Sequence, residues 1–243
     1  MFKVKERMVT VKLFCFPHAG GSASIYLKWN NVIGDNLKLE IIPLEYKGHG
    51  VRMDEDFYVD FNEMAEDMLR YTLNKLSPDE PFMLFGHSMG AYVAFKIANL
   101  LEEKDIFASH LFLSGRATPC FWTEQKKKIS GLPDDEFMKE IISYGGIERE
   151  YLDCPEILDF LLEILRNDFR IIETIDNNSV FLPVKSNISI MNGYDDGEIT
   201  QERVAEWEKY TDGNCKIKFY EGGHFYLNDN LNEICNYILQ CCG

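Results

Sequence analysis

A serine between two glycines is the first feature of this sequence that could do chemistry. Ser88 is the third residue of GHSMG at residues 86–90, which follows an apolar run at 81–85 and precedes a segment of helical spacing. A serine on a sharp strand-to-helix turn needs glycine neighbours, because a Cβ on either would clash. The following helix N-terminus favours a developing oxyanion. We therefore predict that Ser88 is a nucleophile; the alternative is a serine in a plain glycine-rich turn.

A histidine should lie beside Ser88, because a serine hydroxyl is a poor nucleophile until a base removes its proton. His224, in EGGHF at residues 221–225, directly follows the last apolar run of strand length. Parallel sheets hold their sites at this end of their strands. We predict that His224 is the base; the alternative is a histidine that caps a turn. His87, within the serine turn, is expected to be a packing residue, and His110, at the start of a strand, a packing or edge residue.

Two adjacent carboxylates, Asp195 and Asp196, follow the apolar run at residues 187–191. A carboxylate that fixes the tautomer of the histidine would complete a Ser-His-Asp triad in the chain order serine, acid, histidine. We choose Asp196, because Gly197 and then a helical segment follow it. Asp195 remains the alternative, as a turn-forming residue or an outer neighbour of the site.

A run of small residues near the start of the chain, within FPHAGGS at residues 16–22, follows the first apolar run. Small side chains leave backbone N–H groups open to a site, as an oxyanion hole requires. We assign the oxyanion hole to the backbone amides of Ala19 and Met89; the alternative is a plain glycine turn. His18 either shapes this loop or is incidental.

The elements that must position these residues are predicted from hydrophobic spacing. Apolar runs of strand length alternate with segments of helical period, which indicates an α/β fold with a mostly parallel central sheet flanked by helices on both faces. The expected strands cover residues 10–16, 37–42, 81–85, 110–114, 187–191 and 216–220. The expected helices cover residues 60–76, 89–101 and 231–239.

The pattern changes between residues 118 and 183, where no strand is evident. Helical pieces are expected at 134–144, 157–165 and 167–175, separated by Gly145-Gly146 and Pro155. Strands of the same type resume afterwards, so we predict one domain over residues 1–243 with a helical lid insertion at 118–183.

Composition narrows the possible partners. The 243 residues carry 25 Lys and Arg against 40 Asp and Glu, a formal charge of −15 that disfavours nucleic acid and anionic membranes. No apolar run approaches the roughly 18–20 residues of a membrane span, and residues 1–7 lack the apolar core of a signal peptide. Seven scattered cysteines without C-x-x-C spacing are expected to be reduced thiols. We expect a cytoplasmic protein with no nucleic-acid or membrane partner.

These motifs together resemble the type II thioesterases of nonribosomal peptide and polyketide synthesis, which are stand-alone α/β-hydrolases. The resemblance rests on GHSMG, on FPHAGG at residues 16–21 and on GGHF at 222–225. LPDDEF at 132–137 and LRNDFRIIET at 165–174 look like the lid helices of that family, which generic esterases do not share. One departure is KGHG at residues 47–50, where the family usually has PGRG or PGHG; we expect no catalytic group in this loop.

The resemblance implies hydrolysis of acyl groups from the phosphopantetheine arm of acyl or peptidyl carrier proteins, which would clear stalled or wrongly primed synthases. A compatible mechanism has Ser88 attack the thioester carbonyl, with His224 as base and Asp196 orienting it. The Ala19 and Met89 amides would hold the oxyanion, and the lid would shape the acyl pocket. No metal or organic cofactor is required, and small acyl thioesters are further candidate substrates.

Charge bears on carrier recognition, because carrier proteins are commonly acidic and would be repelled at long range. Lys126-Lys127-Lys128 is the most concentrated basic run and a candidate docking patch; the alternative is a solvated helix face.

Competing functions are a carboxylesterase or lipase, an acyl-CoA thioesterase and an acyltransferase on the same fold. A non-catalytic binding protein would be expected to lack a triad member, and none is missing here.

Overall fold

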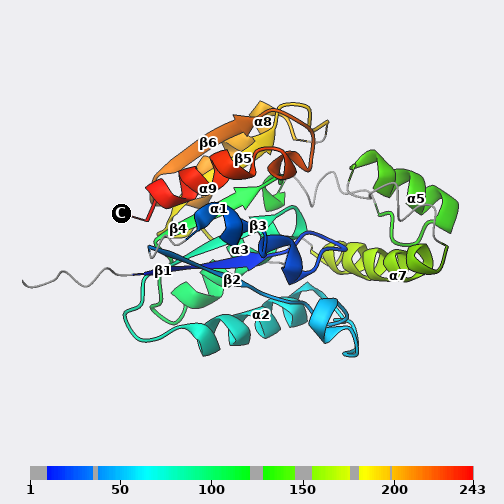
Figure 1. The fold of residues 1–243 in the computed structure, drawn as a ribbon, viewed down its shortest axis with the longest axis horizontal. Coiled ribbons are helices and arrows are strands. Elements are labelled where there is room, and N and C mark those ends of the chain that lie inside the picture. The colour runs from blue at the N-terminus through cyan, green and yellow to red at the C-terminus, as the bar shows by residue number, and fades with distance from the viewer. Residues whose placement is uncertain are drawn as a thin grey trace, which may run out of the picture.

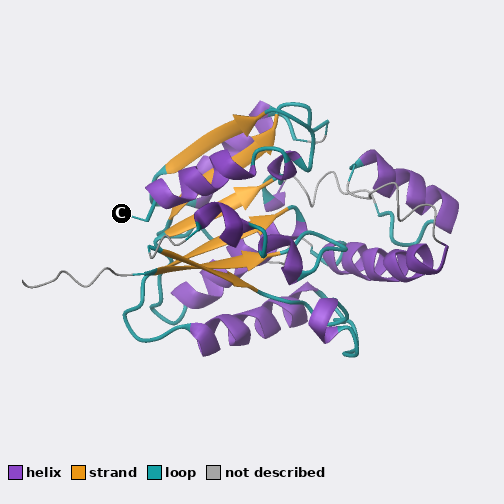
Figure 2. Ribbon diagram, in the orientation of Figure 1, coloured by secondary structure: helices purple, strands orange, loops and turns teal. Residues whose placement is uncertain are grey.

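One parallel sheet forms the centre of the structure (Figure 2). The computed structural model describes residues 10–34, 38–120, 128–145, 155–175, 181–197 and 199–242. Six strands lie in the order β2-β1-β3-β4-β5-β6, and every neighbouring pair is parallel. They are β1 (Val11–Phe16), β2 (Leu39–Pro43), β3 (Phe82–His87), β4 (His110–Ser114), β5 (Asn187–Gly193) and β6 (Cys215–Tyr220). The predicted α/β class is confirmed.

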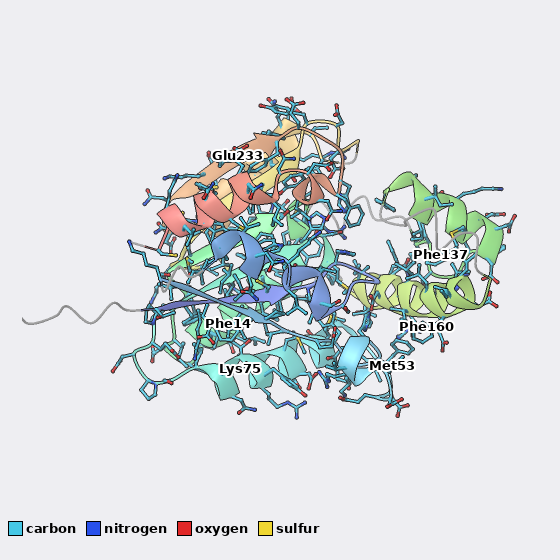
Figure 3. The ribbon with its side chains drawn as sticks, viewed as in Figure 1. Phe14, Met53, Lys75, Phe137, Phe160 and Glu233 are labelled. Carbon is cyan, nitrogen blue, oxygen red and sulfur yellow. The ribbon has the colours of Figure 1, made fainter. Side chains whose placement is uncertain are left out.

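Helices cover both faces of the sheet, α1 (Trp29–Ile33) and α9 (Leu231–Gln240) on one face and α2 (Phe61–Lys75) and α3 (Met89–Glu102) on the other (Figure 1). Side chains of β1 divide accordingly, because successive residues of a strand point to opposite faces. Leu13 packs in the core under α1 and α9, whereas Phe14 packs in the core under α2 and α3 (Figure 3). β3 is buried along its whole length, which explains its unbroken apolar sequence.

The helical segment expected after Gly197 is α8 (Gln201–Ala205), whereas the short helix α1 was not predicted. α1 has five residues, too few for a helical period to stand out from the sequence. α2, α3, α5 (Asp134–Ser143) and α9 agree with prediction to within a residue or two. Asp60 caps α2 by accepting a hydrogen bond from the Glu63 amide at 2.9 Å.

The segment between β4 and β5 contributes α5 (Asp134–Ser143) and α7 (Pro155–Ile172), which lie together beyond one end of the sheet (Figure 1). Phe137 of α5 packs between these helices, with its ring 5.9 Å from that of Phe169 (Figure 3). The prediction of two helical pieces at 157–165 and 167–175 is wrong, because α7 is continuous. Its apolar face carries on past Arg166, whose guanidinium covers the Phe137 ring at 4.4 Å. Among the described helices, none is both long and apolar enough to cross a membrane.

His110, at the start of β4, is buried inside the sheet as a packing residue. Its ring stacks on Phe112 with centroids 4.4 Å apart, and its Nε2 lies 2.7 Å from the hydroxyl of Ser189 on β5. Burial lowers the pKa of His110 to about 4. The folded protein therefore holds this imidazole neutral at pH values where an unfolded chain would protonate it.

This burial predicts a loss of stability in acid. The folded pKa of about 4 lies below the ordinary value of 6.5, so unfolding takes up a proton between these values. The contribution of His110 is complete above about pH 6.5 and declines as the pH falls towards 4. We expect the unfolding free energy of His110→Gln, measured by urea denaturation from pH 7 to pH 4, to fall less steeply than that of the wild type. Parallel pH profiles would contradict this account.

Candidate active site

Ser88 lies on a strained turn between β3 and α3. Its φ of 53° and ψ of −114° are unusual for a residue with a side chain, and its amide donates to the Ser114 carbonyl at 2.8 Å. A Cβ on Gly86 would lie 1.9 Å from the Gly90 carbonyl oxygen, and a Cβ on Gly90 would lie 2.1 Å from that of Phe16. The predicted need for both glycines is therefore confirmed.

Three separate loops bring Ser88, His224 and Asp196 together. His224 Nε2 lies 3.0 Å from Ser88 Oγ, and His224 Nδ1 lies 2.7 Å from Asp196 Oδ2. The loops follow β3, β5 and β6, so the carboxyl ends of parallel strands meet as expected. Asp196 is 7% exposed, whereas Asp195 is exposed and donates its amide to the Gly222 carbonyl at 2.9 Å. Of the two adjacent carboxylates, the structure places Asp196 against the imidazole.

The acid loop and the histidine loop touch through their backbones. A Cβ on Gly193, at the end of β5, would lie 2.3 Å from the carbonyl oxygens of both Gly222 and Gly223. The amide of Tyr194 donates to the Tyr220 carbonyl at 2.8 Å. These contacts fix the distance between the two loops, which in turn sets how Asp196 meets His224.

A polar layer beneath the three residues was missed from the sequence. His87 Nδ1 lies 2.9 Å from the Ser114 hydroxyl, which lies 2.6 Å from the hydroxyl of Tyr226. The His87 ring centroid is 5.0 Å from that of His224, and burial holds the pKa of His87 well below its ordinary value. His87 is thus a neutral packing residue under His224, as predicted. Ser114 ends β4 and Tyr226 follows His224 by two positions, and neither position carries a motif.

The loop after β1 places the Ala19 amide near the start of α3. In the parts of the chain that the structure describes, neither the Ala19 amide nor the Met89 amide donates to a protein acceptor. Both N–H groups are therefore open to another acceptor, and Ala19 lines the same pocket as Ser88. The close approach of Gly90 to the Phe16 carbonyl brings this loop against the turn that carries Ser88.

His18 shapes this loop. Its Nδ1–H donates to the Ala19 carbonyl at 2.9 Å, because a carbonyl can only accept. Burial lowers the pKa of His18 to about 4, so the ring is neutral at pH 7. Two tyrosine hydroxyls hold the start of the loop, since Tyr26 donates to the Phe16 carbonyl at 2.7 Å and Tyr46 to the Pro17 carbonyl at 3.1 Å.

A buried acidic side chain of α7 also reaches this loop. Asp168 Oδ2 accepts a hydrogen bond from the Gly20 amide at 2.7 Å and lies 2.9 Å from His49 Nε2. Asp168 is fully buried and His49 is 2% exposed. His49 belongs to the loop at residues 47–50, for which we expected no catalytic group, and it reaches the site only through Asp168. The one available signal was an aspartate in the middle of the apolar face of an amphipathic helix.

A small pocket and a larger groove adjoin at the site. A pocket of about 50 Å³ adjoins Ser88 and His224, and the helices of the insertion supply its apolar wall, with Ile141, Tyr144, Leu165, Phe169 and Ile172. A larger groove of about 510 Å³ shares His18 and Ala19 with this pocket and extends along the loop after β1 to Lys28. The pocket beside Ser88 can thus accept an apolar group, and the adjoining groove has room for a longer one.

A metal site is not evident at this location. Within the described ranges, no three His, Cys, Asp or Glu side chains are arranged to hold a metal ion. The acid and base pair of the site, Asp196 and His224, are instead hydrogen-bonded to each other.

Comparison with known proteins identifies the family. The family model "Thioesterase domain" matches residues 11–242. Thioesterase PikA5 of Streptomyces venezuelae is 33% identical over 232 residues, which cover 94% of this chain and 79% of that protein. The human medium-chain S-acyl fatty acid synthase thioesterase is 34% identical over 247 residues, which cover 98% of this chain and 89% of that protein.

Solved structures agree with this result. The type II thioesterase BorB from the borrelidin biosynthetic cluster superposes with a TM-score of 0.86 at 27% identity, covering 98% of this chain and 94% of that structure. The resemblance to type II thioesterases inferred from the motifs is therefore confirmed. Because the family match spans nearly the whole sequence, this chain belongs to the thioesterase family, the α/β-hydrolase enzymes that hydrolyse thioesters.

Proposed function

We propose that this chain hydrolyses acyl thioesters carried on the phosphopantetheine arm of carrier proteins. This hydrolysis would clear stalled or wrongly primed synthases of nonribosomal peptides or polyketides. The observation that carries the proposal is the hydrogen-bonded series from Ser88 through His224 to Asp196, with steps of 3.0 and 2.7 Å, beside an apolar pocket. Relatives named for biosynthetic thioesterases support this context.

The proposed chemistry divides hydrolysis into two steps. Ser88 Oγ attacks the thioester carbonyl while His224 Nε2 accepts its proton, and Asp196 stabilises the imidazolium through Nδ1. Collapse of the tetrahedral intermediate breaks the C–S bond, and His224 returns the proton to the leaving sulfur. His224 then activates water against the acyl-enzyme, which releases the free acid and restores Ser88. These steps need no metal or organic cofactor.

The oxyanion of each intermediate would lie between the Ala19 and Met89 amides. Both donors are backbone groups on elements held by glycine contacts, so they need little reorganisation when charge develops. One such donor typically contributes about 10²–10³-fold to kcat. Met89 is also the first residue of α3, whose N-terminal dipole adds to the stabilisation.

The pocket and the groove would divide the substrate between them. The acyl group enters the 50 Å³ pocket under α5 and α7, and the phosphopantetheine arm follows the 510 Å³ groove towards Lys28. In this assignment residues 118–183 are a lid inserted into a single domain of residues 1–243. The pocket lies between the loops that carry Ser88 and His224 and the apolar side chains of α5 and α7.

The size of the pocket favours short acyl groups. Its volume of 50 Å³ is about a tenth of the 510 Å³ of the neighbouring groove. The relatives include a protein named for medium-chain acyl groups, so sequence similarity alone leaves chain length open. We infer acetyl and similarly short groups as substrates.

The carrier-protein partner follows from the substrate. A chain of net charge −15 needs a local patch to bind an acidic carrier, and Lys126-Lys127-Lys128 stays a prediction for that patch. Lys126 and Lys127 lie outside the described residues, and Lys128 is exposed.

Hydrolysis of acetyl-holo-carrier protein tests the proposed function. The wild type should release free acetate, and Ser88→Ala should lower kcat by about 10⁴-fold or more, because the nucleophile is lost. Mass spectrometry of the carrier and its product measures both. Wild-type enzyme that cleaves oxygen esters but leaves the carrier acylated would refute the proposal, and acyl transfer to an added alcohol in place of acetate would favour an acyltransferase.

The adjacent aspartates offer a matched pair of variants. Asp196→Asn should lower kcat by about 10⁴-fold, since an amide favours the wrong histidine tautomer. Asp195→Asn should stay within about twofold of the wild type, because that side chain is exposed. Steady-state kinetics on an acetyl thioester distinguishes the two. A larger loss for Asp195→Asn would reverse the assignment.

Chain length can be tested separately from hydrolysis. We expect kcat/KM for acetyl-carrier protein to exceed that for octanoyl-carrier protein by at least about tenfold, because the pocket is small. Ile172→Ala should lower this acetyl-to-octanoyl ratio, because removing a side chain from the wall enlarges the pocket. Ile142→Ala, which alters an exposed residue of α5, should leave the ratio unchanged. A wild-type preference for octanoyl substrate would overturn the short-acyl assignment and leave the thioesterase function intact.

A further inference from the structure

Three segments distant in the sequence meet at the Asp168 carboxylate: the loop after β1, the loop after β2 and helix α7. We propose that Asp168 is a positioning residue that orients the Ala19–Gly20 peptide. Helix α7, which lines the acyl pocket, would thereby also fix the direction of the Ala19 amide in the oxyanion hole. The proposal rests on the function assigned above to the Ala19 amide.

The peptide unit between Ala19 and Gly20 is held at both of its polar atoms. Its carbonyl oxygen accepts from His18 Nδ1 at 2.9 Å, and its N–H donates to Asp168 Oδ2 at 2.7 Å. A peptide is planar, so two hydrogen bonds on opposite sides fix the rotation of that plane. The N–H of Ala19 lies one Cα away, and its direction depends on this fixed plane.

His49 gives the Asp168 carboxylate its counter-charge. Its Nδ1 faces the Lys47 carbonyl at 2.9 Å and its Nε2 faces Asp168 at 2.9 Å, so both ring nitrogens face acceptors. Burial acts to lower the pKa of His49, but the charge of Asp168 and the hydrogen bonds to Asp168 and Lys47 outweigh burial and raise it. Since both ring nitrogens face acceptors, the doubly protonated ring fits this position and would compensate a buried carboxylate that is otherwise costly.

The same face of α7 presses on the loop through a second residue. Gly20 has a φ of +75°, and a Cβ there would lie 2.6 Å from Leu165 Cδ2. Leu165 precedes Asp168 by three residues, which places both on one side of the helix. Leu165 also lines the acyl pocket, so one helix face contacts both the acyl group and the oxyanion loop.

Asp168 variants test this role. Asp168→Ala removes the acceptor for Gly20, and we expect kcat on acetyl-carrier protein to fall about 10–100-fold with KM within about threefold. Asp168→Asn keeps one acceptor oxygen in nearly the same volume, so its kcat should lie between those of the wild type and Asp168→Ala. If Asp168→Ala does not fold, the Asp168→Asn measurement alone decides the question.

The matched control is Asp134→Asn. Asp134 is an exposed carboxylate of α5 that pairs with Arg166 of α7 at 2.6 Å and thus joins the same two helices. Its loss should lower the melting temperature slightly and leave kcat within about twofold of the wild type. An effect on kcat equal to that of Asp168→Asn would mean that lid stability, and not loop orientation, is what Asp168 supplies.

A readout of the oxyanion hole separates positioning from general destabilisation. An alkylboronic acid adds to Ser88 Oγ through boron and forms a tetrahedral anion, with the serine proton transferred to His224. We expect its Kd to rise in the Asp168 variants by the same factor by which kcat falls. The proposal would be overturned if the wild type is active and the folded Asp168→Ala variant keeps both the kcat and the boronate affinity of the wild type. Inactivity of the wild type on thioesters would instead refute the proposed function.

Discussion

The close approach of two backbones is the constraint on which the rest of the site depends. The turn after β3 passes so near the loop after β1 that only glycine fits at position 90, and the same turn holds Ser88 at a φ of 53°. This contact brings the loop after β1 against the turn that carries Ser88, and Ala19 and Ser88 line the same pocket. The remaining parts of the site are arranged around that pocket by strands whose carboxyl ends already share an edge.

Much of this arrangement was predictable from the sequence because it depends on local chemistry. The glycines at positions 86 and 90 predict a sharp turn around Ser88, because a larger residue at either position would clash. The alternation of strands and helices predicts that this turn lies at the edge of the sheet where the strands end. The choice between Asp195 and Asp196 was not certain, since adjacent residues of a turn differ only in the direction of their side chains. Contacts between Gly193 and the histidine loop, which no local pattern reveals, decide which carboxylate faces inward.

The features that the sequence did not reveal are long-range pairings of polar groups. Asp168 and His49 are separated by 119 positions, and each alone has an ordinary surface interpretation. The continuity of α7 was missed for a related reason, since Arg166 interrupts an apolar run but covers Phe137 in the fold. Burial is a property of the assembled molecule, so spacing alone could not distinguish a charge at the surface from one enclosed between a helix and two loops.

The cluster of imidazoles around Ser88 also determines where a proton can go. His18 and His87 have ring centroids 6.0 Å apart, and His87 lies 5.0 Å from His224. Burial lowers the pKa of both His18 and His87. In the proposed mechanism, a proton taken from Ser88 meets no competing base among these rings. Because their pKa values are lowered, His18 and His87 would not take this proton from His224. It would stay on His224 until it is transferred to the leaving sulfur or, after water attacks the acyl-enzyme, back to Ser88.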